Sequence, residues 1–253
     1  MDRSHGDSAA LYALRLGLDS ARVSSFRLPV TIEPATLVIR STAEPAPLII
    51  CLHPARMTEF QFAHALRGLV ALRAHLAFPR GLHAHEVDLG GAQTVGYAWF
   101  HYTGDNPAFR ESLAQADAYL SRVLERLLLD LPVDRRAIFV LGAGDGASLA
   151  AAHANAHAER IAGVVAIGSR LRLETLAQAG ESARRLPILR LTDRRKRTAR
   201  EVSPEVRSAE LHELGFAVDL EEIRTSQDSW NEEEGAVIAW LTQKAGIGIQ
   251  VPG

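Results

Sequence analysis

The sequence of 253 residues is poor in cysteine, in net charge and in long apolar runs. Its single cysteine, Cys51, excludes an intramolecular disulfide. A formal net charge of −2 at pH 7 provides no overall field toward nucleic acid, so no nucleic-acid partner is expected. No apolar stretch approaches the roughly 18 residues of a membrane span, and the N-terminal residues lack the pattern of a signal peptide. These absences predict a cytoplasmic protein without a membrane span.

Apolar runs typical of buried strands alternate with segments of helical spacing over most of the chain. The runs are continuous, as parallel strands covered on both faces require, and they lie at residues 48–52, 137–141, 161–167 and 187–191. Apolar residues at helical spacing lie between them, at residues 60–72 and 109–127. Strands that alternate with helices predict a doubly wound, mostly parallel sheet in an α/β fold of three layers.

We predict a single domain over residues 1–253, because no linker or low-complexity tract interrupts the pattern. Residues 1–34 are predicted to form an N-terminal extension that includes the first strand. Residues 81–106 are predicted to be a long loop, rich in glycine and carrying an aromatic group. A loop of this length usually has a function. We therefore expect it to form a pocket wall, with Tyr97, Trp99 and Phe100 as lining residues.

Residues 138–150 are the stretch around which the rest of the chain is organised. They are typical of a buried strand, a tight turn and a helix. In this context the pattern Gly-x-Ser-x-Gly presents the nucleophile of an α/β-hydrolase on a strained turn. The outer glycines are present as Gly142 and Gly146, but the central residue is Gly144. The turn therefore has no side chain at the position from which a nucleophile would attack.

The order of elements and the local sequence resemble the phospholipase/carboxylesterase branch of the α/β-hydrolases, which includes acyl-protein-thioesterase-like enzymes. The resemblance covers about residues 35–245, and it is carried by residues 48–53, 96–100, 138–142, 163–168, 186–191 and 230–234. It implies an α/β-hydrolase fold, serine ester hydrolysis, a small acyl or ester-like ligand, no cofactor and no metal. It leaves the oligomeric state open, a homo-oligomer included.

The same resemblance places residues that cannot catalyse at the catalytic positions. The nucleophile position is Gly144, the acid position is Lys196 and the base position is Gln227. Because a triad acts as a unit, these losses together remove nearly all of its rate enhancement. We therefore predict a catalytically inactive relative that keeps an acyl or ester-like ligand pocket near Gly144.

The oxyanion loop also departs from the family pattern. His53 is followed by Pro54 where the family has glycine, and proline has no backbone N–H to donate. Residual activity would rest on pocket binding and on any oxyanion donor that is left, such as the Asp145 N–H. We expect His53 to line the pocket or, more simply, to bond a neighbouring backbone group.

Other chemistries remain as alternatives. An ester hydrolase of a different arrangement is one, and a non-enzymatic binding or scaffold subunit is another. Asp145 at the turn resembles the nucleophile of haloalkane and epoxide hydrolases, but no histidine follows His212 to activate water. The simpler role for Asp145 is to cap the helix. Gly142, Gly144 and Ala147 also fit a dinucleotide fingerprint, although it falls on a middle strand.

Two further pairs of histidines carry metal-ligand side chains. His83 and His85 lie in the predicted loop at loose spacing, and surface histidines are expected there. His153 and His157 lie four residues apart on one helix, without the glutamate of a metalloprotease motif. A partly exposed helix face is expected for this pair, and no metal site is predicted.

Overall fold

The computed structural model describes residues 32–89, 91–102, 104, 106–169, 171, 176, 179–193, 203–223 and 230–249. The chain divides after residue 33, and the fold described below belongs to the unit of residues 34–253. The extension and first strand predicted within residues 1–34 lie almost wholly outside the described residues. None of the helices in the described ranges is long and apolar enough to cross a membrane.

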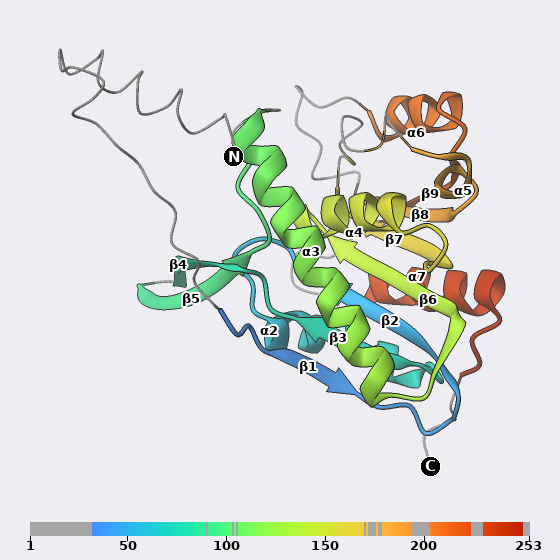
Figure 1. Cartoon of the computed structure of the whole chain (residues 1–253), viewed down its shortest axis with the longest axis horizontal. Coiled ribbons are helices and arrows are strands. Elements are labelled where there is room, and N and C mark those ends of the chain that lie inside the picture. Colours follow the sequence, from blue (N-terminus) through green and yellow to red (C-terminus); the bar gives the residue numbers. More distant parts are fainter. Residues whose placement is uncertain are drawn as a thin grey trace, which may run out of the picture. The chain divides into compact units, whose positions relative to one another are not determined.

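The main sheet is mostly parallel, as predicted. In the described part of the chain it has seven strands, in the order β1-β3-β2-β6-β7-β8-β9 (Figure 1). Only β1 runs antiparallel to its neighbour, β3, among these strands. The strands are β1 (Thr36–Ile39), β2 (Ala46–Leu52), β3 (His75–Pro79), β6 (Val133–Ala143), β7 (Gly163–Ile167), β8 (Pro187–Asp193) and β9 (Ala217–Ile223).

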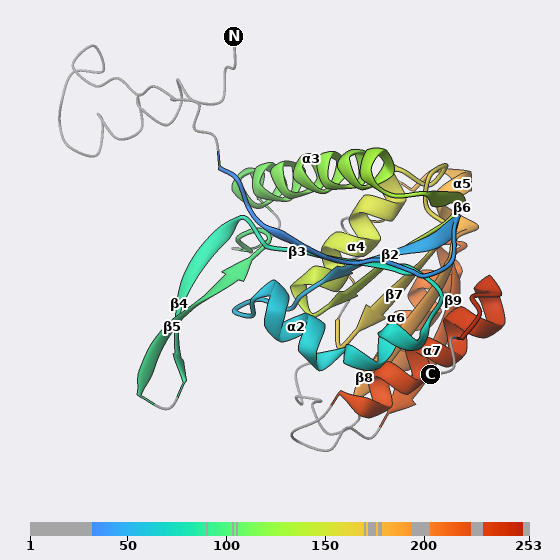
Figure 2. The ribbon, with the colours of Figure 1, turned by 90° about the horizontal axis from the view of Figure 1, so that it is seen from below.

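Helices cover both faces of this sheet, which gives the predicted three layers (Figure 2). α3 and α4 pack on one face, while α2, the 3₁₀ helix η2 and α7 pack on the other. The described helices are α2 (Glu59–Ala65), η2 (Arg67–Ala71), α3 (Pro107–Asp130), α4 (Asp145–Ala156), α5 (Glu181–Arg184), α6 (Pro204–Glu213) and α7 (Asn231–Ala245).

Strand β2 lies inside the sheet because its apolar residues serve both cores. Leu48, Ile50 and Leu52 belong to the core beneath α3 and α4. Ile49 and Cys51 belong to the core beneath α2 and α7. Successive side chains of a strand point to opposite faces, so a continuous apolar run fills both layers at once. Burial raises the pKa of the Cys51 thiol, which therefore acts as a small apolar group.

Helix α3 begins at a side-chain cap. The side chain of Asn106 accepts a hydrogen bond from the Phe109 N–H at 3.0 Å, and Pro107 occupies the first turn. Both features satisfy or remove backbone donors that have no partner inside the helix. This cap fixes the start of the helix that carries Asp117 toward α4.

The prediction of a long loop at residues 81–106 is wrong for most of its length. β4 (His83–Leu89) and β5 (Ala92–Ala98) pair antiparallel as a hairpin (Figure 2). Gly91 follows the tip with a φ of +93°, as a tight hairpin connection requires. The strands include Asp, Glu, Ala and Gly, which are depleted in strands, and these residues interrupt the apolar pattern that would have predicted them.

Candidate functional site

The turn between β6 and α4 keeps the backbone shape of a nucleophile elbow. Gly144 has φ +53° and ψ −119°, a conformation that residues with a side chain adopt only at a cost. Its N–H donates to the carbonyl oxygen of Ile167, the last residue of β7, at 2.9 Å. The turn therefore lies at the carboxyl edge of the sheet, where open α/β sheets bind ligands.

Close backbone packing explains the two outer glycines. A Cβ on Gly142 would lie 2.3 Å from the carbonyl oxygen of Gly146. A Cβ on Gly146 would lie 2.3 Å from the carbonyl oxygen of Leu52, at the end of β2. Real Cβ atoms do not approach backbone this closely, so both positions need glycine whatever residue stands between them.

Pro54 lies next to the place that a side chain at position 144 would occupy. A Cβ on Gly144 would lie 3.3 Å from the Pro54 Cβ, which is tighter than ordinary contact. Pro54 also has no N–H, so this part of the loop donates nothing to an oxyanion. The elbow therefore combines a missing nucleophile with a covered approach.

Asp145 is the first residue of α4, and the prediction that its side chain caps the helix is wrong. The N-cap is Gly144, which makes no side-chain cap bond. The Asp145 carboxylate instead lies in the first turn, where the positive end of the helix dipole stabilises negative charge.

His53 is a buried structural histidine, as the simpler prediction for it stated. The N–H of Gly81 donates to its Nε2 at 3.0 Å, and its Nδ1 lies 2.9 Å from the carbonyl oxygen of Pro54. The first bond requires a lone pair on Nε2, which places the proton of the neutral ring on Nδ1. Burial lowers the pKa of His53 and favours this neutral form. Both ring nitrogens are thus occupied by backbone groups.

The aromatic residues predicted to line a pocket make packing contacts. Trp99 is wholly buried, its Nε1–H donates to the carbonyl oxygen of His53 at 2.7 Å, and the two rings lie 4.7 Å apart. Phe100 packs edge-on against Phe109. The Arg80 guanidinium lies 4.8 Å from the centre of the Tyr97 ring. A pocket lined by these residues and His53 remains a prediction.

The sequence did not predict the ion pair between Glu59 and Arg80, which lies next to Tyr97. Glu59 is wholly buried, and Arg80 Nε lies 3.0 and 3.1 Å from its two carboxylate oxygens. The adjacent loop is tied to β5, because the Arg56 N–H donates to the Tyr97 carbonyl and the Tyr97 N–H donates to that of Met57. These bonds hold in place the loop that carries Pro54.

The predicted acid and base positions, Lys196 and Gln227, lie outside the described residues. β8 ends at Asp193 and β9 ends at Ile223, so both positions follow strands of the main sheet. Their assignment as former triad positions remains a prediction.

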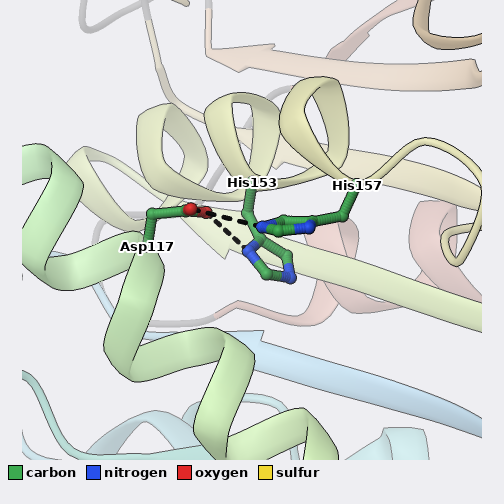
Figure 3. A group of neighbouring side chains, drawn as sticks. All are labelled: Asp117, His153 and His157. Atoms are coloured by element: carbon green, nitrogen blue, oxygen red, sulfur yellow. Dashed lines mark hydrogen bonds and ion pairs between the residues drawn. The ribbon is translucent and has the colours of Figure 1, made fainter.

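A second cluster of chemistry-bearing side chains lies at the other end of α4. Asp117 of α3 meets His153 and His157, and we call these residues the Asp117 group (Figure 3). The His153 Nδ1 lies 2.7 Å from Asp117 Oδ1, and the His157 Nε2 lies 3.2 Å from Oδ2. The prediction of a partly exposed pair is wrong for His153, whose side chain is buried.

Electrostatics keeps the Asp117 carboxyl ionised. Burial alone raises the pKa of Asp117, but the hydrogen bonds and charge of His153 and His157 outweigh burial. The pKa of this carboxyl therefore lies below its usual value. The sequence showed the two histidines at helical spacing, but it could not show Asp117, which is 36 and 40 positions away.

The Asp117 group and its neighbour Ser121 do not form a relocated catalytic triad. The Ser121 Oγ lies 3.2 Å from the Nε2 of His157, and Asp117 contacts that same nitrogen. A triad places the serine and the acid on opposite nitrogens of the histidine, so that the ring can pass a proton. The arrangement therefore lacks the bonding of a serine hydrolase.

The histidines predicted for a surface loop lie on strand β4 instead. The ring of His101 lies 4.3 Å from that of His83 and 5.6 Å from that of His85, between ring centres. Within the described ranges, the Asp117 group is the only set of three or more His, Cys, Asp or Glu residues whose ligand atoms all lie within 4.8 Å.

Comparisons with known proteins agree with this architecture. The sequence model of the Phospholipase/Carboxylesterase family matches residues 34–195. No curated protein matches the chain. The crystal structure of the Bacillus cereus carboxylesterase is 15% identical, with a TM-score of 0.63, over 83% of this chain and 94% of that chain.

Two further structures show the same likeness. A carboxylesterase from Mesorhizobium loti is 17% identical, with a TM-score of 0.62, over 78% of this chain and 88% of that chain. Zea mays acyl-protein thioesterase 2 is 17% identical, with a TM-score of 0.59, over 82% and 99%. At these identities the likeness establishes the α/β-hydrolase fold.

Proposed function

Because this chain belongs to the phospholipase/carboxylesterase family of α/β-hydrolases, we propose that it is a member without serine-esterase activity, whose fold serves binding. The observation that carries this proposal is Gly144. Its φ and ψ are those of a strained elbow, and it has no side chain. The family's reaction begins with attack by a side chain at this point, and here none exists.

The expected loss of rate is large enough to favour an inactive protein over an enzyme of reduced activity. Removing one member of a catalytic triad lowers the rate by about 10⁴ to 10⁶, and further losses add little. The residual catalysis of such sites comes from the oxyanion hole and substrate binding. Pro54 supplies no N–H to that hole, so residual catalysis would depend on other groups such as the Asp145 N–H and the dipole of α4.

Nearby serines do not supply a substitute nucleophile. Ser148 and Ser169 are buried, and their hydroxyl oxygens lie 3.3 Å apart. The Ser169 Oγ also accepts a hydrogen bond from the Leu171 N–H at 3.2 Å. None of the bonds of these two hydroxyls leads to a histidine within the described residues, and a serine needs such a base to attack an ester.

The proposed ligand is a small acyl or ester-like molecule at the carboxyl edge of the sheet, beside Gly144. Family membership and the position of the turn support this ligand. Titration calorimetry with fatty acids from butyrate to laurate tests it, and we expect saturable binding of at least one chain length. Heat signals equal to those of buffer for every length would contradict the ligand and favour a scaffold subunit.

Turnover of p-nitrophenyl butyrate tests the loss of activity. We expect the native chain to match heat-denatured protein, because neither presents an activated nucleophile. The variants Ser148→Ala and Ser169→Ala serve as matched controls and should give the same rate. Turnover above background that either variant abolishes would contradict the proposal and identify an active hydrolase of another arrangement.

A further inference from the structure

The Asp117 group is built by two helices that pack against each other on one face of the sheet. His153 and His157 are four residues apart, so both project from the same side of α4. Figure 3 shows both rings directed at the carboxylate of Asp117, which projects from α3. One ligand atom from each residue lies within 4.8 Å of the other two. Three potential ligands thus converge on one small volume.

The identity of the donors favours a particular class of ion. Two imidazoles and one carboxylate suit Zn²⁺ and its neighbours Co²⁺, Ni²⁺ and Cu²⁺, whereas Ca²⁺ and Mg²⁺ take oxygen ligands. We propose that Asp117, His153 and His157 bind a divalent transition-metal ion of the Zn²⁺ class, with water as the fourth ligand. This site is distinct from the elbow and does not depend on the proposed function.

The two nitrogen–oxygen distances within the group are near those between ligands of a tetrahedral site. With metal–ligand bonds of about 2.0 to 2.1 Å, two tetrahedral ligands lie roughly 3.3 Å apart. The His157 Nε2 is 3.2 Å from Asp117 Oδ2, and the His153 Nδ1 is 2.7 Å from Oδ1. One ligand atom from each residue lies within 4.8 Å of the other two, so the side chains need only draw together for a metal to replace the bridging protons.

The burial of the group suits an ion that keeps one water. The His153 side chain is 1% exposed and anchors the site, while Asp117 and His157 are each 26% exposed. That exposure gives the ion and its water a way in from solvent. Ser121 Oγ lies 3.2 Å from the His157 Nε2, where its hydroxyl can orient the metal-bound water.

The ring of His153 makes its hydrogen bond to Asp117, inside the group. Its buried Nε2 has no hydrogen-bond partner within the described ranges, so its contact with Asp117 through Nδ1 orients the ring. A metal bound at Nδ1 would join α3 to α4 more firmly than the hydrogen bonds do. The competing explanation is a purely hydrogen-bonded bridge, and metal titration separates the two.

The test uses the full-length chain without an affinity tag, stripped of metal by a chelator and titrated with Co²⁺. We expect one Co²⁺ per chain, with the visible absorption of a four- or five-coordinate ion, and displacement by one equivalent of Zn²⁺. Asp117→Asn and His157→Gln should each raise the Kd by at least about tenfold. Circular dichroism checks folding, and His157→Gln, at a partly exposed position, decides if Asp117→Asn does not fold.

Two control variants locate the ion. His212→Gln removes an exposed histidine from α6, and the double variant His83→Gln/His101→Gln removes the ring cluster beside β4. Neither should change the stoichiometry or the Kd. Absence of Co²⁺ binding overturns the proposal, and so does binding that survives both Asp117 and His157 substitutions or is lost in the His83/His101 variant. The ester assay has no bearing on any of these outcomes.

Discussion

The two ends of helix α4 differ in what they preserve. At the N-terminal end the backbone has the shape of a reactive turn, but Gly144 offers no reactive group. At the C-terminal end His153 and His157 meet Asp117, and their bonding is not that of a family triad. The contrast shows that the backbone geometry of the turn does not depend on a reactive side chain.

Packing is the reason that the N-terminal end keeps its shape. Gly142 and Gly146 are required because β6, α4 and the end of β2 approach within the space of a Cβ. That requirement holds with or without a nucleophile. A glycine at position 144 in addition relieves the strain that a side chain suffers at positive φ. The backbone of the elbow therefore does not require a nucleophile at its centre.

The largest effect in this comparison is expected from Gly146→Ala. The new Cβ would meet the Leu52 carbonyl oxygen at 2.3 Å and that of His53 at 2.7 Å, so α4 must move away from β2. We expect urea denaturation to show a loss of about 3 kcal/mol in the free energy of unfolding. Gly235→Ala in α7 is the control: its Cβ meets nothing within 4 Å, so it should be neutral or stabilising. Equal effects would show that close packing does not hold the elbow.

At the other end of the helix, Asp117→Ala should cost about 2 kcal/mol, because hydrogen bonds to an ionised group are lost and the buried His153 Nδ1 has no acceptor. Unfolding in the presence of a chelator measures this cost without any metal. Asp130→Ala, on the same helix, removes an exposed pair with Arg126 and should leave stability nearly unchanged. If both variants change the free energy of unfolding equally, the Asp117 group contributes no more to stability than an exposed ion pair does.

A smaller effect is expected from Gly144→Ala, because positive φ costs a residue with a side chain about 1 to 2 kcal/mol. Contact with Pro54 at 3.3 Å adds to that cost. The double variant with Pro54→Gly separates the two contributions through a mutant cycle. A favourable coupling between the two substitutions is expected, and strict additivity would show that Pro54 does not cover the elbow.

The smallest effect is a pH dependence that comes from His53. Burial lowers its pKa in the folded chain, so the unfolded chain binds more protons below the ordinary histidine pKa of about 6.5. The stability is therefore complete above that pH and falls as the pH drops toward the folded value. Between pH 7.5 and 5.5 we expect this group to make the free energy of unfolding fall with a slope of at most about 1.4 kcal/mol per pH unit.

The slope of stability against pH identifies the group responsible. His53→Gln should flatten the slope in urea denaturation, whatever its effect on stability at pH 7.5. Burial also lowers the pKa of His75 and His83, so part of the slope should persist in the variant. An unchanged slope would mean that His53 does not titrate as its buried, backbone-bonded position requires.

The sequence predicted the features that depend on local pattern. The apolar run of β2 and the glycines of the elbow each follow a short-range rule, and the structure has both. The order of the elements, read from the alternation of apolar runs and helical spacing, in turn carried the family resemblance. The sequence did not predict the hairpin at residues 83–98. Its two strands are held together by pairing of their backbones, which leaves no apolar pattern, and several of its residues are depleted in strands.

The features that the sequence missed depend on distant packing. Asp117 reaches His153 only because α3 crosses α4 at one particular register, which no local pattern encodes. Glu59 and Arg80 meet because α2 and the end of β3 lie side by side. The contact between Pro54 and position 144 likewise depends on how the β2 loop folds back over the elbow.

Intact mass spectrometry of the folded native chain after treatment with a fluorophosphonate tests the central claim most directly, since this probe labels only activated serines. We expect an unchanged mass, because the elbow residue is Gly144 and the buried Ser148 and Ser169 have no histidine base within the described residues. A single stoichiometric adduct on a serine at the carboxyl edge of the main sheet would contradict it.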